Sequence, residues 1–320
     1  MAPDLRPGRI LGWAAVPAAV ALVARATRRS ARSSAAISWA PPAGRPDTEI
    51  LAVRILGEGL PATVLLHGMF ASGQYWGAAY DELGAETMVV VPDLAGFGRS
   101  VDVTAGYGPD DHADLVAETL RHLGAAGAPV VIGAHSLGCL VALRLAARHP
   151  ELVAGIVGFS PPLYSDPDAA RRSLGRAHFL VRLFALSPRL SEAACRWIRG
   201  HRPLATRLAR LARPDLPEAL AKDRLKHTYL SYSTTLAKVI VAAGTGASID
   251  RLRVPVHLVA GDKDTVVDLA YLAELEACND GVSLAIWPGA GHEVPLTHPS
   301  QCLAEMRRLR VALAAEPVVS

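Results

Sequence analysis

Residues 130–150 read VVIGAHSLGCLVALRLAARHP, and Ser136 stands where two patterns meet. The run before the serine is apolar and β-branched, as in a buried strand, and the run after it is typical of a helix. Ala134 and Gly138 flank the serine two positions away on each side. A chain that passes from strand to helix over so few residues makes a sharp turn that exposes the hydroxyl. A serine that merely caps the helix fits this stretch as well, so the rest of the sequence has to decide.

The composition indicates a globular protein. The chain has 320 residues, of which 51% are hydrophobic, and this length suits one large α/β domain with an insertion or two small domains. The cysteines are scattered and lack the spacing of zinc ligands, so we interpret them as small buried side chains and expect no metal and no cofactor. They are Cys139, Cys195, Cys278 and Cys302.

The net charge of +3 is unevenly distributed. Residues 1–35 hold six arginines and one acidic residue, and residues 165–226 hold fourteen basic and six acidic residues. The rest of the chain is therefore acidic. Basic residues are not interleaved with aromatic ones, as they are in nucleic-acid modules, so we expect no nucleic-acid partner.

The amino-terminal segment, residues 1–36, is apolar and basic. An uncharged run, ILGWAAVPAAVALVA, lies between Arg9 and Arg25. It is short for a membrane-spanning helix and contains Pro17. A signal peptide, an interfacial membrane anchor and a tail all remain open. The arginines after the run argue against export, so a membrane-associated or cytoplasmic location is favoured over secretion.

From residue 37 onwards, short apolar runs alternate with helical patterns, which predicts an α/β fold with a doubly wound, mostly parallel sheet. We assign residues 37–160 and 252–320 to this core. The first strand can also be antiparallel. The predicted strands are 49–56, 62–68, 87–93, 129–135, 153–160, 254–262 and 282–292, and the predicted helices are 75–84, 110–124, 137–148, 268–278 and 298–314.

The alternation stops over residues 161–251, where one helical pattern follows another. The predicted helices there are 177–186, 191–200, 203–212 and a long run over 217–243. A helical insertion between two strands of a sheet predicts a cap over the carboxyl ends of the strands.

A serine hydroxyl becomes a good nucleophile only beside a histidine, whose tautomer is in turn fixed by a carboxylate. Both residue types follow later strands, with Asp264 in GDKD (261–264) and His292 in GAGH (289–292). Loops at the carboxyl ends of parallel strands meet at one edge of the sheet. Asp262 is an alternative acid. The turn HGMF (67–70) can aim the amide of Met69 at the same point as that of Leu137.

Together these pieces resemble the α/β-hydrolase superfamily, in its capped, serine-nucleophile branch. The matching stretches are HGMF (67–70), PDLAGFGRS (92–100), AHSLG (134–138), GDKD (261–264) and GAGH (289–292). The resemblance implies that Ser136 is the nucleophile, His292 the general base and acid, and Asp264 the orienting carboxylate. It also implies that the backbone amides of Met69 and Leu137 form the oxyanion hole.

The reaction that the resemblance implies is cleavage of an ester, thioester or lactone through an acyl-enzyme, with a small-molecule or acyl-chain substrate. A serine at the nucleophile position argues against a haloalkane dehalogenase or an epoxide hydrolase, which need a carboxylate there. Three alternatives stay open. They are a carbon–carbon bond hydrolase, an acyltransferase with the same triad, and a non-catalytic binding protein on a hydrolase fold.

Other polar residues near these motifs receive structural interpretations. We expect His67 to brace the oxyanion loop. Adjacent strand residues point to opposite faces, so His135 is expected to be structural. Glu293 is interpreted as a solvated loop residue. The resemblance implies that Asp93 and Ser100 hold a turn.

The basic stretch of the insertion suggests a docking surface. Arg207, Arg210 and Arg213 recur at helical spacing, and leucines run along a neighbouring face. A solvated face explains this pattern, and so does a surface that docks an anionic membrane or an acidic carrier protein.

Overall fold

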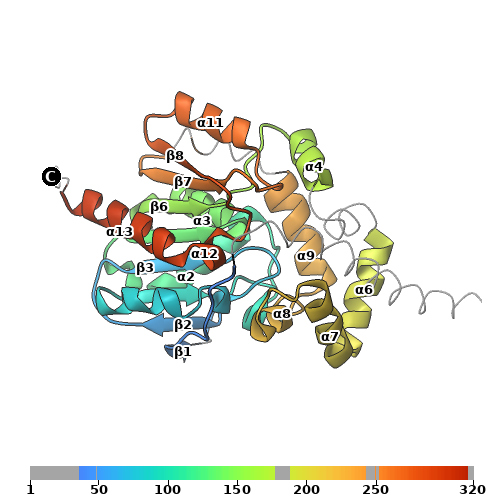
Figure 1. Cartoon of the computed structure of the whole chain (residues 1–320). Coiled ribbons are helices and arrows are strands. Elements are labelled where there is room, and N and C mark those ends of the chain that lie inside the picture. The colour runs from blue at the N-terminus through green and yellow to red at the C-terminus, as the bar shows by residue number, and fades with distance from the viewer. Residues whose placement is uncertain (1–35, 48, 177–187, 243–248, 250–251, 316–320) are drawn as a thin grey trace, which may run out of the picture.

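The computed structural model describes residues 36–47, 49–176, 188–242, 249 and 252–315 (Figure 1). Within these residues, eight strands form one sheet in the order β1-β2-β4-β3-β5-β6-β7-β8. The strands are β1 (Arg45–Asp47), β2 (Val53–Leu56), β3 (Thr63–Leu66), β4 (Val89–Pro92), β5 (Val130–His135), β6 (Val153–Phe159), β7 (Val256–Gly261) and β8 (Val282–Trp287).

The sheet confirms the predicted class, an α/β fold with a doubly wound, mostly parallel sheet. Strands β3 to β8 run parallel to one another. Strand β2 pairs antiparallel with β4, which was one of the two possibilities for the first predicted strand. Strand β1 was not predicted, because its sequence, RPD, has no apolar pattern. It forms by pairing with the outer edge of β2.

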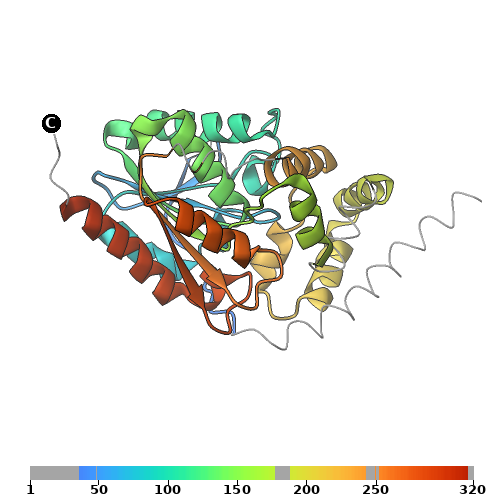
Figure 2. The ribbon, with the colours of Figure 1, turned by 90° about the horizontal axis from the view of Figure 1, so that it is seen from above.

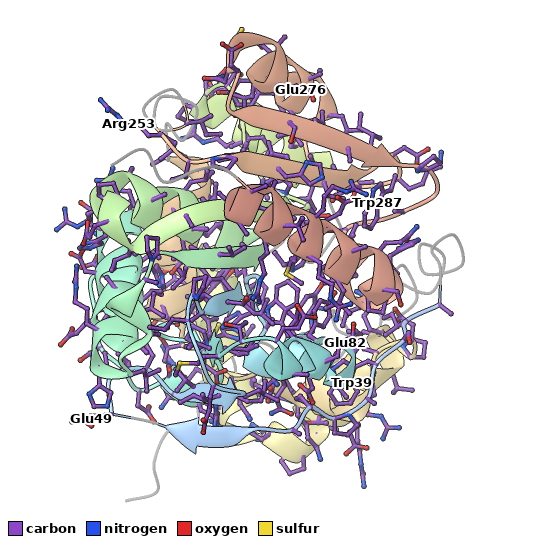
Figure 3. All side chains as sticks on the ribbon, turned by 90° about the vertical axis from the view of Figure 1, so that its left-hand side faces the viewer. Trp39, Glu49, Glu82, Arg253, Glu276 and Trp287 are labelled. Carbon is purple, nitrogen blue, oxygen red and sulfur yellow. The ribbon has the colours of Figure 1, made fainter. Side chains whose placement is uncertain are left out.

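Two helical layers cover the sheet, because alternate residues of each strand point to opposite faces (Figure 2). In β3, Val64 and Leu66 belong to the apolar cluster that α2, α3 and α11 share, whereas Leu65 belongs to the cluster under η4 and α13. Figure 3 shows the layer formed by η4 and α13, with Glu82 of η4 labelled. The helices are α2 (Pro109–His122), α3 (Leu137–Arg148), α11 (Leu269–Cys278), α12 (Val294–Thr297), α13 (Pro299–Ala315) and the 3₁₀ segments η3 (Gly73–Tyr75), η4 (Ala78–Ala85), η5 (Gly98–Ser100), η6 (Ala125–Gly127) and η7 (Pro150–Leu152).

The elements described between β6 and β7 are helices, and they lie at one end of the sheet (Figure 1). We refer to residues 161–251 as the cap. Its elements are α4 (Pro167–Arg176), α6 (Pro188–Gly200), α7 (Arg202–Ala212), α8 (Glu218–Asp223), α9 (Tyr229–Thr235) and the π-helix η8 (Leu236–Val241). The helix predicted over 177–186 lies outside the described residues.

The long helix predicted over 217–243 is wrong, because the chain leaves helical geometry between α8 and α9. Backbone contacts to the core replace helical hydrogen bonds there. The amide of Gly98 donates to the carbonyl of Lys226 at 3.0 Å, and Phe97 forms a β-bridge with His227. A periodic pattern contains no sign of such a distant partner.

Three smaller expectations also differ from the structure. The helix predicted over 75–84 is two 3₁₀ segments, η3 and η4, with Gly77 between them. Cys278 is exposed at the end of α11, while the other three cysteines are buried. The predicted anchor or signal segment lies outside the described residues, among which no helix is long and apolar enough to cross a membrane.

Candidate active site

Ser136 occupies the turn between β5 and α3, as predicted. Its backbone has φ 50° and ψ −117°, a region that residues other than glycine rarely adopt. The amide of Ser136 donates to the carbonyl of Phe159, at the end of the neighbouring strand β6, at 2.9 Å. This bond ties the turn to β6 and holds the hydroxyl above the edge of the sheet.

Two glycines allow the close approaches that this arrangement needs. A Cβ on Gly138 would lie 2.5 Å from the carbonyl oxygen of Leu66, and one on Gly261 would lie 2.1 Å from that of Ala290. Both neighbours are backbone atoms, which cannot move aside as a flexible side chain can. Gly138 thus lets α3 start directly against β3, and Gly261 lets the loops that follow β7 and β8 touch.

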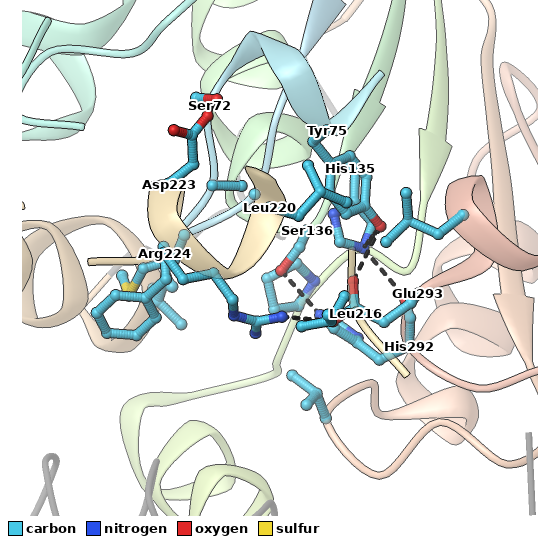
Figure 4. Close-up of a pocket in the computed structure, with 18 of the residues that line it drawn as sticks. Ser72, Tyr75, His135, Ser136, Leu216, Leu220, Asp223, Arg224, His292 and Glu293 are labelled. Atoms are coloured by element: carbon cyan, nitrogen blue, oxygen red, sulfur yellow. Dashed lines mark hydrogen bonds and ion pairs between the residues drawn. The ribbon is translucent and has the colours of Figure 1, made fainter. Parts of the chain in front are cut away.

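The structure brings Ser136, Asp264 and His292 together from three separate loops. Figure 4 shows Ser136 beside His292. Nδ1 of His292 lies 2.8 Å from Oδ2 of Asp264, and Nε2 of His292 lies 3.1 Å from Oγ of Ser136. The other oxygen of Asp264 accepts from the amide of Val266 at 2.8 Å. Asp262, the alternative acid, accepts from the amide of Gly289 instead, at 2.7 Å.

The two titratable partners of Ser136 stabilise each other's charged forms. Burial disfavours the ionised carboxylate of Asp264, but the charge and hydrogen bond of His292 and the Val266 amide outweigh it, so the pKa of Asp264 is lowered. Burial likewise disfavours the imidazolium of His292, but Asp264 outweighs it and the pKa of His292 is raised. A proton taken up by His292 is therefore well accommodated.

The loop after β3 passes beside Ser136, and His67 braces it as expected. The amide of Leu94 donates to Nε2 of His67 at 2.9 Å, so the proton is on Nδ1, which donates to the carbonyl of Gly68 at 2.7 Å. Burial lowers the pKa of His67, which keeps this neutral form. Met69 follows and lines the same cavity as Ser136, while Leu137 is the first residue of α3.

A cavity of about 130 Å³ lies over Ser136 and His292, between the sheet edge and the cap. Its wall is mostly apolar, with aliphatic side chains from α4, α8 and η8 and from the connections between the elements. These include Met69, Leu174, Leu216, Leu220, Leu236 and Ile240. The charged groups of Asp223, Arg224 and Glu293 interrupt this wall.

The sequence interpretation of Glu293 as a solvated loop residue is wrong. Its side chain is only 17% exposed and lies 3.2 Å from Nη1 of Arg224. The hydroxyl of Tyr75 donates to its second oxygen at 3.0 Å. Glu293 sits next to His292, but its partners are 69 and 218 residues away, and no local pattern predicts those contacts.

His135 has the structural surroundings that its strand position predicted. Its ring stacks on Tyr75, with centroids 4.7 Å apart, and its Nε2 donates to the carbonyl of His292 at 2.9 Å. Burial, and then the nearby His292, lower the pKa of His135 to about 4. Neutral His135, the residue before Ser136, therefore holds the backbone of His292 through this hydrogen bond.

The basic face of the cap differs from the predicted one. Helix α7 ends at Ala212, so Arg213 turns away from Arg207 and Arg210 and forms an ion pair with Asp215 at 2.7 Å. Other basic residues complete a surface groove between α7 and α8 that has a volume of about 480 Å³. We define the basic groove by Arg202, Arg207, Arg210, Lys222 and Lys226.

The sheet, the turn at Ser136 and the hydrogen-bonded histidine and carboxylate define the protein class as an α/β-fold hydrolase. Residues 63–305 match the pattern of the alpha/beta hydrolase family, and the chain belongs to that family.

Individual relatives are similar at lower levels of identity. A protein of Shigella flexneri named "Putative carbamate hydrolase RutD" is 28% identical over 246 residues, which are 75% of this chain and 87% of the relative. The structure of E-2-(acetamidomethylene)succinate hydrolase is similar with a TM-score of 0.64 and 21% identity, covering 84% of this chain and 99% of that one. The structure of the N-acyl homoserine lactonase AidH complexed with N-butanoyl homoserine is similar with a TM-score of 0.66 and 19% identity. The match covers 86% of this chain and 99% of that one.

Proposed function

We propose that this hydrolase cleaves an ester, thioester or lactone through an acyl-enzyme on Ser136. The observation that supports this most strongly is the chain of contacts from Asp264 through His292 to Ser136, at 2.8 and 3.1 Å, beneath an apolar cavity. Such a chain has the geometry in which a histidine takes the proton of an attacking hydroxyl.

In the first half of the proposed reaction, Oγ of Ser136 attacks the carbonyl carbon while Nε2 of His292 takes its proton. Asp264 stabilises the imidazolium, and the amides of Met69 and Leu137 stabilise the oxyanion. When the tetrahedral intermediate collapses, the bond to the leaving group breaks. The leaving group receives the proton from His292, and the acyl group stays on Ser136.

In the second half, a water molecule gives a proton to His292 and attacks the acyl carbon. The same two amides stabilise the second oxyanion. The bond between the acyl carbon and Oγ then breaks, and His292 returns its proton to Ser136. The acid is released, and no redox partner is needed.

The cavity favours a small, uncharged acyl group. Its volume of about 130 Å³ is close to the ~150 Å³ of an engineered apolar cavity that binds benzene, so a short chain fits while the cap stays in place. The name lactonase on one similar structure agrees with a cyclic ester as substrate.

A panel of p-nitrophenyl esters of rising acyl length, run beside lactones and acyl thioesters, tests the proposal. We expect the highest kcat/KM with short acyl groups and a loss of roughly 10⁴-fold in Ser136→Ala. Folded protein that turns over none of these substrates would contradict the proposal.

The same panel separates the alternatives. Turnover of a dienol diketone without turnover of esters would indicate a carbon–carbon bond hydrolase. Acyl transfer to an added alcohol that outcompetes hydrolysis would indicate an acyltransferase. No turnover and no covalent labelling of Ser136 would indicate a binding protein on a hydrolase fold.

For the partner, we propose that the basic groove docks an anionic membrane surface, which makes the protein membrane-associated. Five cations line the groove, among them Arg210 and Lys222, which pair with Glu218, and Lys226, which pairs with Asp223. Leu204 and Leu211 of α7 are 45% and 51% exposed. Cations beside exposed leucines suit the boundary between lipid headgroups and acyl chains.

Vesicle binding tests this docking. We expect stronger binding to anionic than to neutral vesicles, weakened by salt, and we expect the preference to be lost when Arg202, Arg207 and Arg210 are changed to Gln. Hydrolysis of a small soluble ester should be unaffected. Equal binding to both vesicle types would contradict the proposal, and salt-sensitive binding only to an acidic carrier protein would replace the membrane with that partner.

A further inference from the structure

The loop that carries His292 is held on the cap side by a cluster of partly buried charges. Oε1 of Glu293 lies 3.2 Å from Nη1 of Arg224 and 3.7 Å from Nη1 of Arg213. Both arginines belong to the cap, since Arg224 follows α8 and Arg213 follows α7. Figure 4 shows the side chain of Arg224 reaching across the pocket towards Glu293 and His292.

On the core side, the same carboxylate is tied to β5, the strand that ends at His135, just before Ser136. Its Oε2 accepts from the hydroxyl of Tyr75 at 3.0 Å, and Tyr75 stacks on His135 with an angle of 12° between the rings. His135 in turn donates to the carbonyl of His292 at 2.9 Å. Glu293 thus joins the cap, the residue next to Ser136 and the backbone of His292.

We propose that Glu293 and Arg224 form a latch that couples the position of the cap to the position of His292. In this proposal, which rests on the proposed function, Glu293 and Arg224 are positioning residues and do not touch the reacting atoms. Removing a charge from most of its water is unfavourable unless the charge is paired, and the side chain of Glu293 is only 17% exposed. Glu293 therefore holds the histidine loop in place only while the cap presents its two arginines.

The latch also has an electrostatic consequence for His292, which several charged groups face. Asp264 approaches from the loop after β7, Glu293 is the next residue in the chain, Arg224 approaches from the cap, and neutral His135 lies at the end of β5. Asp264 and Glu293 raise the pKa of His292, and Arg224 lowers it. Removing the charge of Glu293 should therefore lower the pKa of His292, and removing that of Arg224 should raise it.

The test uses the variants Glu293→Gln and Arg224→Gln and follows kcat/KM for a neutral short-chain ester against pH. We expect the acid limb to move down in Glu293→Gln and up in Arg224→Gln, by roughly half a pH unit or more, because nearby charges shift a pKa by that much. In both variants kcat should fall about tenfold while KM changes little, because the loop is less well positioned. The control is Arg171→Gln in α4, because Arg171 pairs with the exposed Asp168. It should change neither the acid limb nor kcat.

A second readout does not depend on hydrolysis. Amide hydrogen exchange should become faster in α8 and in residues 289–293 of both latch variants, and should stay unchanged in Arg171→Gln. If Ser136→Ala retained full activity, the proposed function would be wrong. The exchange result would still test whether Glu293 and Arg224 couple the cap to the loop of His292. Arg224 is 35% exposed, so its variant is expected to fold even if Glu293→Gln does not.

Both results are required. Acid limbs that move in the same direction, or do not move, overturn the latch, and so does unchanged exchange in α8. If Arg224 instead anchored a substrate carboxylate, Arg224→Gln would raise KM only for esters that bear a carboxylate and would leave the acid limb in place. That outcome also overturns the latch.

Discussion

Asp264 and Asp262 are two residues apart, and only Asp264 faces His292. Its Oδ2 lies 2.8 Å from Nδ1 of the histidine, while Asp262 accepts from Gly289, on the turn before the histidine. The sequence left both acids open. The turn at 261–264, in which the amide of Asp264 donates to the carbonyl of Gly261 at 3.1 Å, separates them.

The first prediction compares these two acids. In Asp264→Asn, the amide oxygen can still accept from Val266, but the NH₂ group then faces Nδ1 of His292. The histidine is held in the tautomer that cannot take a proton on Nε2, so we expect kcat to fall by roughly 10³ to 10⁴-fold. Asp262→Asn should be mild. Steady-state kinetics on one ester decides, and a silent Asp264→Asn beside a damaging Asp262→Asn would reverse the assignment.

The second prediction concerns the packing under the turn. Gly138→Ala places a Cβ against the carbonyls of Leu66 and His67, so the free energy of unfolding should fall by about 1–3 kcal/mol, together with activity. Gly175→Ala in α4 is the matched control, because a Cβ there meets nothing within 4 Å and should be neutral or slightly stabilising. Urea denaturation measures both. A fully stable and active Gly138→Ala would contradict the close approach of α3 to β3.

The third prediction follows from the raised pKa of His292. The neutral imidazole is the base, so activity is lost as pH falls through this pKa. Because Asp264 raises the pKa, the acid limb of kcat/KM should lie above the ordinary histidine value of ~6.5. A profile with a neutral ester measures it. An acid limb clearly below that value would mean that burial lowers the pKa of His292 more than Asp264 raises it.

The fourth prediction concerns acid stability. Burial lowers the pKa of His112, His135 and His227 to about 4 in the folded protein. Between about pH 6.5 and 4 the unfolded chain therefore binds protons that the folded chain does not, and the free energy of unfolding falls as pH falls. These three groups contribute at most about 4 kcal/mol per pH unit to the slope.

Denaturation at about pH 7 and about pH 5 measures this slope. His112→Gln should make the slope smaller by at most about 1.4 kcal/mol per pH unit, since one of the buried histidines is removed. A pH-independent stability over this range would show that the buried histidines are protonated in the folded state.

Much of the fold could be predicted because it depends on local patterns. Apolar runs and the helices between them predict the sheet, and the turn at Ser136 is marked by its small neighbours. The edge strand β1 and the break at His227 depend on partners elsewhere in the chain. Residues 45–47 pair with β2, and the bridge from Phe97 to His227 replaces helical hydrogen bonds.

The candidate site divides in the same way. Ser136, Asp264 and His292 follow strands whose carboxyl ends must meet, so their proximity was predictable. Glu293 was misinterpreted because its ion pairs come from Arg213 and Arg224 in the cap, and nothing in the order of the chain places them beside it. Arg213 was grouped with Arg207 and Arg210 because helical spacing does not show that α7 ends at Ala212.

Covalent labelling of Ser136 tests the central claim most directly. A fluorophosphonate probe should add one label per chain, with the adduct on the peptide that contains Ser136 when the protein is digested and examined by mass spectrometry. Ser136→Ala should take up no label, and His292→Ala should react far more slowly, because its serine lacks a base. Wild-type protein that is folded but unlabelled, or labelled equally in Ser136→Ala, would contradict the account.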